Sequence, residues 1–273
     1  MTTTHKRGVL VAVANPEGVA PLMAIALAAS GPDDEPPLRV LALVGQRGGA
    51  AGTEAPGPQA QESPPPPPAL TAAVEYARAR GVTVDARTMR SDAPALVIGT
   101  VARAAEVAWI LLGYHRAASG GDTLGGVVRE VFIEAKKLSI NVGVFIQGTD
   151  RPFERVFAAI DTGPDGRAAL ELGARIARGN RSRLRALLLS HDALAISATQ
   201  PDAALVDMIH DARARMGRLF HTDVLTQRSR QQLFRQSPGR LLIVGKRFAD
   251  EIGLPLDEVP DGDRCVIVVQ GAH

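Results

Sequence analysis

The chain has 273 residues, of which 45% are hydrophobic and 22% are charged, and its formal net charge is +2. This composition excludes a disordered chain, and the small positive excess excludes the broad basic face that binding to nucleic acid requires. Single domains cluster at about 100 to 150 residues, so the length favours two domains.

The cysteine count, the spacing of the histidines and the hydropathy argue against an internal disulfide, a two-histidine metal site and a membrane span. The one cysteine, Cys265, lies in an apolar run, so an internal disulfide is excluded. The six histidines are scattered without the spacing of a two-histidine metal site, so we predict no metal. No apolar run reaches the roughly 18 to 20 residues of a membrane span, and the first residues lack the apolar core of a signal peptide. We therefore predict a cytoplasmic protein.

The first half of the chain alternates short apolar strands with helices. A strand, a turn and then a helix is typical of a parallel sheet that is buried on both faces. A turn at 15–18 follows the first strand and leads into a helix that ends at Ser30. The other helices are predicted at 69–80, 93–105 and 124–138, and the strands at 8–14, 38–44, 82–88, 107–113 and 142–146.

An insert at 45–68 separates the second strand from the next helix. It is loaded with Gly, Pro, Gln and Glu and closes in a run of prolines from Pro64. Such a segment cannot bury apolar area, so we predict a disordered loop that ends in a stiff polyproline II segment. A docking site for a proline-recognition module is the alternative to a tolerated surface insertion.

The second half repeats the same order of elements. An arginine-rich stretch at 175–185 is interpreted as a solvated helix end and loop. Three matched pieces indicate an internal repeat with a boundary near 148–152: 38–41 with 184–187, 77–80 with 212–215, and 147–148 with 270–271. Strands are predicted at 156–160, 184–190, 222–226, 241–244 and 266–269, and helices at 167–178, 203–219 and 229–236.

The best candidate for a binding site is the glycine-rich loop at 113–127. In an open parallel sheet, ligands bind at the carboxyl ends of strands where the strand order reverses. This loop follows the fourth strand and runs into a helix, whose unpaired N–H groups and positive dipole end suit a phosphate.

A five-stranded unit with such a loop resembles the universal stress protein family. Its ATP-binding members carry Gly-x2-Gly-x9-Gly-[Ser/Thr] at this place. Gly113 and Gly126 match, whereas Arg116 stands at the second glycine and Val127 at the hydroxyl residue. The resemblance covers the whole chain. It implies two tandem α/β domains, each a five-stranded, Rossmann-like parallel sheet, at 1–150 and 151–273, the second degenerate and with a shortened C-terminal part.

The resemblance also implies an adenine nucleotide, ATP or AMP, in the first domain. Val13 and Asn15 would flank the base and ribose, and Val44 would line the adenine. The residues around the phosphate would be Gly113, His115, Arg116, Gly125, Gly126 and Val127.

Several of these residues have a second interpretation. Arg116 either clamps a phosphate while His115 gives a pH-sensitive contact, or both belong to a solvated strand end. Asn15, next to Pro16, contacts the ribose or only forms a turn.

A possible second site is marked by Asp161 and Gly245. Asp161 stands where the family has the acidic residue that contacts the ribose, and it is equally a candidate cap for the following helix. The segment 248–262 lacks the glycine loop and a full fourth helix, so we expect this domain to bind no ATP in the family's way.

Short signatures are similar to the tandem tail of bacterial monovalent cation:proton antiporters. These are Ala14-Asn15-Pro16, His115-Arg116 and the helix start at 125–129. The similarity implies a regulatory domain at the cytosolic face of the inner membrane, with its antiporter domain in the same chain or a companion chain. A homodimer is expected.

We therefore predict a nucleotide-sensing regulatory module that is not an enzyme. The alternative is that both sites have decayed and the tandem serves only as a dimerisation or docking domain. Slow ATP hydrolysis is disfavoured, since no general base or carboxylate pair for magnesium is placed near the loop.

The phosphate clamp gives the first testable prediction. Replacing Arg116→Gly should weaken ATP binding by about 1.5 to 3 kcal/mol, because a hydrogen bond to a charged group is lost. Calorimetric titration of ATP against both proteins measures the difference, and an unchanged affinity would remove Arg116 from the site.

Overall fold

The computed structural model describes residues 8–30, 38–45, 65–114, 126–147, 152–161, 163–189, 203–225, 240–251 and 264–272. The predicted helix at 229–236 and most of the insert at 45–68 lie outside these ranges.

The first half contributes five strands and four helices within the described ranges. The strands are β1 (Val9–Val13), β2 (Arg39–Val44), β3 (Asp85–Arg90), β4 (Trp109–Gly113) and β5 (Asn141–Gln147). The helices are α1 (Val19–Ala29), α2 (Pro68–Arg78), α3 (Pro94–Ala104) and α4 (Gly126–Lys137), and a short 3₁₀ helix, η1, covers Pro16–Gly18.

The second half follows the same order. Its strands are β6 (Arg155–Ile160), β7 (Arg183–Leu189), β8 (Phe220–Leu225), β9 (Arg240–Gly245) and β10 (Arg264–Gln270). The described helices are α5 (Pro164–Gly179), α7 (Ala203–Met216) with the 3₁₀ turn η2 (Gly217–Leu219), and α9 (Lys246–Glu251). Helix α9 has six residues, whereas its counterpart α4 has 12.

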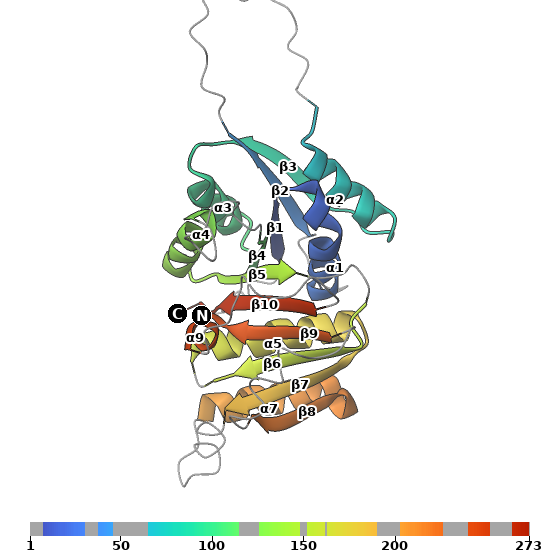
Figure 1. Ribbon diagram of the computed structural model, residues 1–273, viewed down its shortest axis with the longest axis vertical. Helices are drawn as coiled ribbons and strands as arrows, with labels where there is room; N and C mark the ends of the chain where they lie inside the picture. Colours follow the sequence, from blue (N-terminus) through green and yellow to red (C-terminus); the bar gives the residue numbers. More distant parts are fainter. Residues whose placement is uncertain are drawn as a thin grey trace, which may run out of the picture.

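One ten-stranded sheet runs through the molecule in the order β3-β2-β1-β4-β5-β10-β9-β6-β7-β8 (Figure 1). Each half is parallel, and β5 pairs with β10 antiparallel, from Val266 opposite Gln147 to Gln270 opposite Val142. The predicted α/β fold, with two five-stranded Rossmann-like units in tandem, is confirmed. The two halves pair with each other within one chain, which the sequence did not reveal.

Local sequence explains how the helices begin and how the strands are buried. Pro68, Pro94 and Pro164 each open a helix, where a missing N–H costs nothing. Strands β1 and β6 are buried along nearly their whole length, as expected for parallel strands covered on both faces.

Helices cover both faces of the sheet. On one face, α1, α2, α5 and α7 pack on a single core that continues across both halves. On the other face, α3 and α4 cover the first half and α9 packs on the second. The side chain of Tyr114 contacts the clusters of both halves on this second face.

The junction between the halves is closed by helices as well as by strands. Helix α1 packs on α5, and a Cβ at Gly179 would collide with the carbonyl oxygen of Ala28. Below them, the fully buried Trp109 of β4 donates from Nε1 to the Oε1 of Glu171 on α5 at 3.2 Å. The halves are therefore joined through strand pairing, a close backbone contact and side-chain hydrogen bonds, which include Gln270 Nε2 to the backbone oxygen of Phe132 at 2.9 Å.

Several predicted boundaries differ from the structure by a few residues, and two of the differences have a clear physical cause. The strand predicted at 82–88 begins only at Asp85, because Gly81 adopts a φ of 72° and the N–H of Val82 bonds back to Ala77, which completes the end of α2. The helix predicted from Arg167 begins at Pro164, since the apparent turn at 163–166 is already its first turn.

The close approach of α1 and α5 gives a second prediction. Gly179→Ala should lower the free energy of unfolding by about 1 to 3 kcal/mol, because the new methyl group forces the helices apart. Denaturant titration followed by the fluorescence of Trp109, the one tryptophan, measures the loss.

Gly126→Ala is the matched control for this measurement. Its Cβ would meet no atom within 4 Å, so stability should stay the same or rise. Equal stability of the Gly179→Ala and Gly126→Ala variants would contradict the tight contact.

Candidate functional site

The strand order reverses once in each half, between β1 and β4 and between β6 and β9. At the first of these points the chain leaves β1 for α1 on one face and leaves β4 for α4 on the other face. This is the position at which doubly wound sheets bind ligands.

The first-half candidate site gathers residues from the ends of three neighbouring strands. Val13 lies opposite Ala42 of β2 and beside Gly113 of β4, and Val44 ends β2. The side chain of Val13 is only 4% exposed and packs into the core, whereas Val44 is 37% exposed. Of these two apolar side chains at the strand ends, Val44 is the one that is open to a ligand.

Helix α4 begins at Gly126, and a Cβ at that position would meet no atom within 4 Å. The next side chain, Val127, is 46% exposed. The start of this twelve-residue helix is therefore unobstructed by the described residues. His115, Arg116 and Gly125 lie outside the described residues.

Asn15 forms the turn after β1. Its Oδ1 accepts a hydrogen bond from the N–H of Glu17 at 3.1 Å and caps η1. The interpretation of Asn15 as a turn former is confirmed, because its side-chain oxygen accepts this hydrogen bond within the turn. The side-chain NH₂ makes no bond to the other residues that the structure describes, so a ribose contact is left to that group.

The second-half site is occupied by the chain itself. Asp165, in the first turn of α5, accepts from the N–H of Gly271 at 2.9 Å and from the N–H of Arg247 at 3.1 Å. A Cβ at Gly245, which is buried at the end of β9, would lie 2.9 Å from the Cβ of Asp165. A carboxylate therefore binds the backbone N–H groups where β9 and β10 end, the kind of group that could otherwise bind a phosphate.

Asp161 is also used within the fold. Its Oδ1 accepts from the N–H of Gly163 at 2.8 Å and from the N–H of Gly166 at 3.2 Å, which fixes the turn into α5. A Cβ at Gly166 would collide with the backbone of Asp161. The capping interpretation is confirmed, and the enclosure of Gly245 leaves it no room to contact a ligand.

Sequence reasoning missed Asp165. The signal was present, because an acidic residue directly after a helix-opening proline complements the positive end of the helix dipole. The two donors to its carboxylate could not be found from sequence, since Arg247 and Gly271 are far away along the chain.

Among the described residues, the groups with shifted pKa values, Asp85 and Arg87, lie away from both candidate sites. The pKa of Asp85 at the start of β3 is lowered, chiefly by a hydrogen bond from Arg87, and Arg39 lies 3.3 Å away. These charges protect the exposed edge strand β3.

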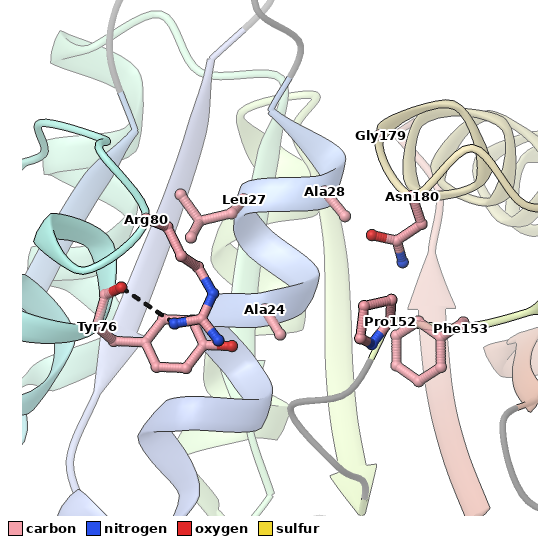
Figure 2. A pocket seen from close by; sticks show the side chains of 9 residues that line it. All are labelled: Ala24, Leu27, Ala28, Tyr76, Arg80, Pro152, Phe153, Gly179 and Asn180. Carbon is pink, nitrogen blue, oxygen red and sulfur yellow. Dashed lines mark hydrogen bonds between the residues drawn. The ribbon is translucent and has the colours of Figure 1, made fainter.

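A cleft of about 220 Å³ opens between the two halves on the α1, α2 and α5 side. Figure 2 shows Arg80 stacked on Tyr76 at one side, with the guanidinium 3.5 Å from the ring centroid, and Asn180 at the other side. Arg80 also donates to the backbone oxygen of Tyr76 at 3.3 Å. None of the predicted site residues lines this cleft.

No protein-family model and no curated protein matches the sequence. Solved structures do match over nearly the whole chain. A universal stress protein from Archaeoglobus fulgidus DSM 4304 has a TM-score of 0.54 and 13% identity, with 97% of this chain and 96% of that chain covered. A putative universal stress protein from Pseudomonas aeruginosa UCBPP-PA14 has a TM-score of 0.50 and 16% identity, with 97% and 93% covered.

A third match is the cytoplasmic domain of a prokaryotic cation chloride cotransporter. Its TM-score is 0.54 at 11% identity, with 97% of this chain and 96% of that chain covered. At these identities the matches establish the fold: the chain has the universal stress protein fold.

The internal carboxylate gives a third prediction. Asp165→Ala should lower the free energy of unfolding by about 1 to 3 kcal/mol, because two backbone N–H groups lose their acceptor. Asp165→Asn keeps one acceptor oxygen and should lie between the wild type and the Ala variant in urea titrations.

Asp207→Ala serves as the control, since Asp207 is exposed on α7 and a surface change of this kind shifts stability by less than about 0.5 kcal/mol. An Asp165→Ala variant as stable as this control would show that the two hydrogen bonds contribute little.

Proposed function

We propose that the chain is a non-catalytic regulatory module that binds an adenine nucleotide, ATP or AMP, in its first half and acts on a membrane transporter. The observation that carries the proposal is the difference between the halves. The second half fills the end of its sheet with Asp165 of α5, whereas α4 of the first half begins at Gly126, where a Cβ would meet no described atom within 4 Å.

Different residues of the first half would contact the phosphates, the adenine and the ribose. The start of α4 at Gly126, with Gly113, Gly125, His115 and Arg116, would hold the phosphates through N–H groups and positive charge. Val44 would cover the adenine, and the NH₂ of Asn15 would contact the ribose.

The transporter part of the proposal is supported by the match to the cytoplasmic domain of a cation chloride cotransporter. None of the helices in the described part of the chain is long and apolar enough to cross a membrane. The membrane part would be an antiporter domain, in this chain or in a companion chain, with the module on its cytosolic side.

A docking or dimerisation role without a ligand is the second candidate. It is favoured by exposed apolar side chains on α3 and α4, where Leu96 is 58%, Ile133 52% and Val127 46% exposed. A homodimer would need such a surface, because β5 and β10 already pair within the chain.

The fourth prediction tests nucleotide binding by adding a negative charge to the proposed phosphate site. Gly126→Asp places a carboxylate at the start of α4. The wild type should bind ATP or AMP saturably in calorimetric titrations, and Gly126→Asp should weaken binding at least tenfold, about 1.4 kcal/mol, through repulsion of the phosphates.

Thr71→Asp is the matched control, because it adds the same charge to the first turns of α2 at an exposed position and should leave the affinity unchanged. Release of phosphate from ATP would contradict the non-catalytic part. If the wild type binds neither ATP, AMP nor a cyclic dinucleotide, the docking or dimerisation role becomes the favoured function.

A further inference from the structure

The floor of the cleft between the halves is one face of helix α1. Ala24, Leu27 and Ala28 line the cleft, and their i, i+3 and i+4 spacing brings them to the same side of the helix. Ala24 and Leu27 are only half-buried, although α2 and α5 both pack on this helix. Because two of the three side chains are single methyl groups, the floor is apolar and leaves room for a flat group above it.

The walls of the cleft carry one aromatic ring from each half. Tyr76 of α2 stands on one side and Phe153, which precedes β6, stands on the other, with the face of α1 between them (Figure 2). Phe153 is only 2% exposed and belongs to the core that continues across both halves, and Tyr76 packs against the same core. Aromatic rings attract one another in offset and edge-to-face arrangements. The two walls therefore favour a ligand that is itself aromatic.

Arg80 supplies the charge at the cleft. Its guanidinium carbon lies 3.5 Å from the centroid of the Tyr76 ring, and its Nη1 donates to the backbone oxygen of Tyr76 at 3.3 Å. These two contacts hold the planar group in one orientation, and its Nε and Nη2 donate to no other described residue. No described carboxylate forms an ion pair with Arg80, and none lines the cleft. The remaining donors can therefore bind the two oxygens of a carboxylate.

Asn180 lies at the opposite side of the cleft from Arg80 (Figure 2). It follows the last residue of α5, and its backbone N–H bonds to the carbonyl oxygen of Ile176. Its side chain is half-buried, and the side-chain amide makes no hydrogen bond to another residue that the structure describes. Buried polar groups usually have a partner. This amide is thus a second polar group that a ligand in the cleft could contact.

The volume of the cleft limits the size of the ligand. Its volume of about 220 Å³ is below the roughly 300 to 1,000 Å³ of pockets for drug-sized ligands, so a nucleotide is too large. An apolar cavity of about 150 Å³ is enough for benzene, so one ring with a small substituent fits. The single charge of Arg80 also matches a carboxylate better than a phosphate monoester, which carries about −1.5 to −2 charges.

We propose that this cleft binds a small aromatic carboxylate, of the size of benzoate or phenylacetate. The ring would lie on the face of α1 between Tyr76 and Phe153, and the carboxylate would accept hydrogen bonds from Nε and Nη2 of Arg80. Such a ligand would contact both halves and so stabilise their junction. The proposal does not depend on nucleotide binding, because none of the residues of the proposed nucleotide site lines the cleft.

The test is calorimetric titration of the full chain with sodium benzoate. The wild type should bind benzoate saturably with a dissociation constant of about 1 mM or lower, as a good ligand of this size can. Benzamide has the same shape without the charge and should bind at least about tenfold more weakly, because the charge-assisted bonds to Arg80 are lost. Saturating benzoate should also raise the melting temperature, since binding to the folded state stabilises it.

Two substitutions test the charge and the floor separately. Arg80→Gln should weaken benzoate binding at least about tenfold. The control Arg78→Gln removes the same charge from an exposed position on α2 outside the cleft and should change binding less than twofold. Ala24→Leu fills the cleft from its floor and should abolish binding, whereas Ala104→Leu adds the same bulk at an exposed position on α3 and should have no effect.

A wild type that binds no benzoate would overturn the proposal, and so would an equal loss in the Arg80→Gln and Arg78→Gln variants. Hexanoate that binds as tightly as benzoate, or inorganic phosphate that binds more tightly, would overturn the aromatic carboxylate as the ligand class. Displacement of benzoate by AMP would assign the cleft to a nucleotide instead. Gly126→Asp should bind benzoate as the wild type does, so failure of nucleotide binding is distinguished from failure at this cleft.

Discussion

The antiparallel pairing of β5 with β10 is the constraint on which the rest of the structure depends. It converts two parallel five-stranded units into one sheet and reverses the strand direction at the junction. Helices α1 and α5 can then meet across the junction at Gly179, and Trp109 of one half can bond to Glu171 of the other. The reversal also puts the carboxyl ends of the first half on the same edge as the amino ends of the second.

The two halves share a topology but differ in how the carboxyl ends of their strands are filled. In the second half the end of the sheet is locked, because Asp165 connects α5 to the segments that follow β9 and β10. In the first half, helix α4 starts at Gly126, where a Cβ would meet no described atom within 4 Å.

The sequence predicted what depends on local pattern. Apolar runs separated by helices predicted the strands, their parallel arrangement and the tandem order, and Val44 and Gly113 do end β2 and β4, the strands on either side of β1. Prediction was less accurate where one particular hydrogen bond decides, whether local or distant. The β3 strand starts late because Val82 bonds back to Ala77, and Asp165 is bonded to residues more than 80 positions away. The β5–β10 pairing and the cleft beside Arg80 depend on packing between the halves. The sequence of an apolar strand does not reveal which strand it will pair with. Asn15 and Asp161 had two interpretations each, and only the hydrogen bonds to Glu17 and Gly163 distinguished them.

The pairing of β5 with β10 also sets the order in which the protein can be completed during synthesis. Gln147 ends β5 and Gln270 ends β10, so more than a hundred residues are translated between the two partner strands. At about 5 to 20 residues per second, the edge of β5 stays open for several seconds or more on the ribosome. An open, apolar strand edge is a template for pairing with another chain. Chains that stop before β10 would therefore need a chaperone most, because β10, the last described strand, is the one that covers the edge of β5.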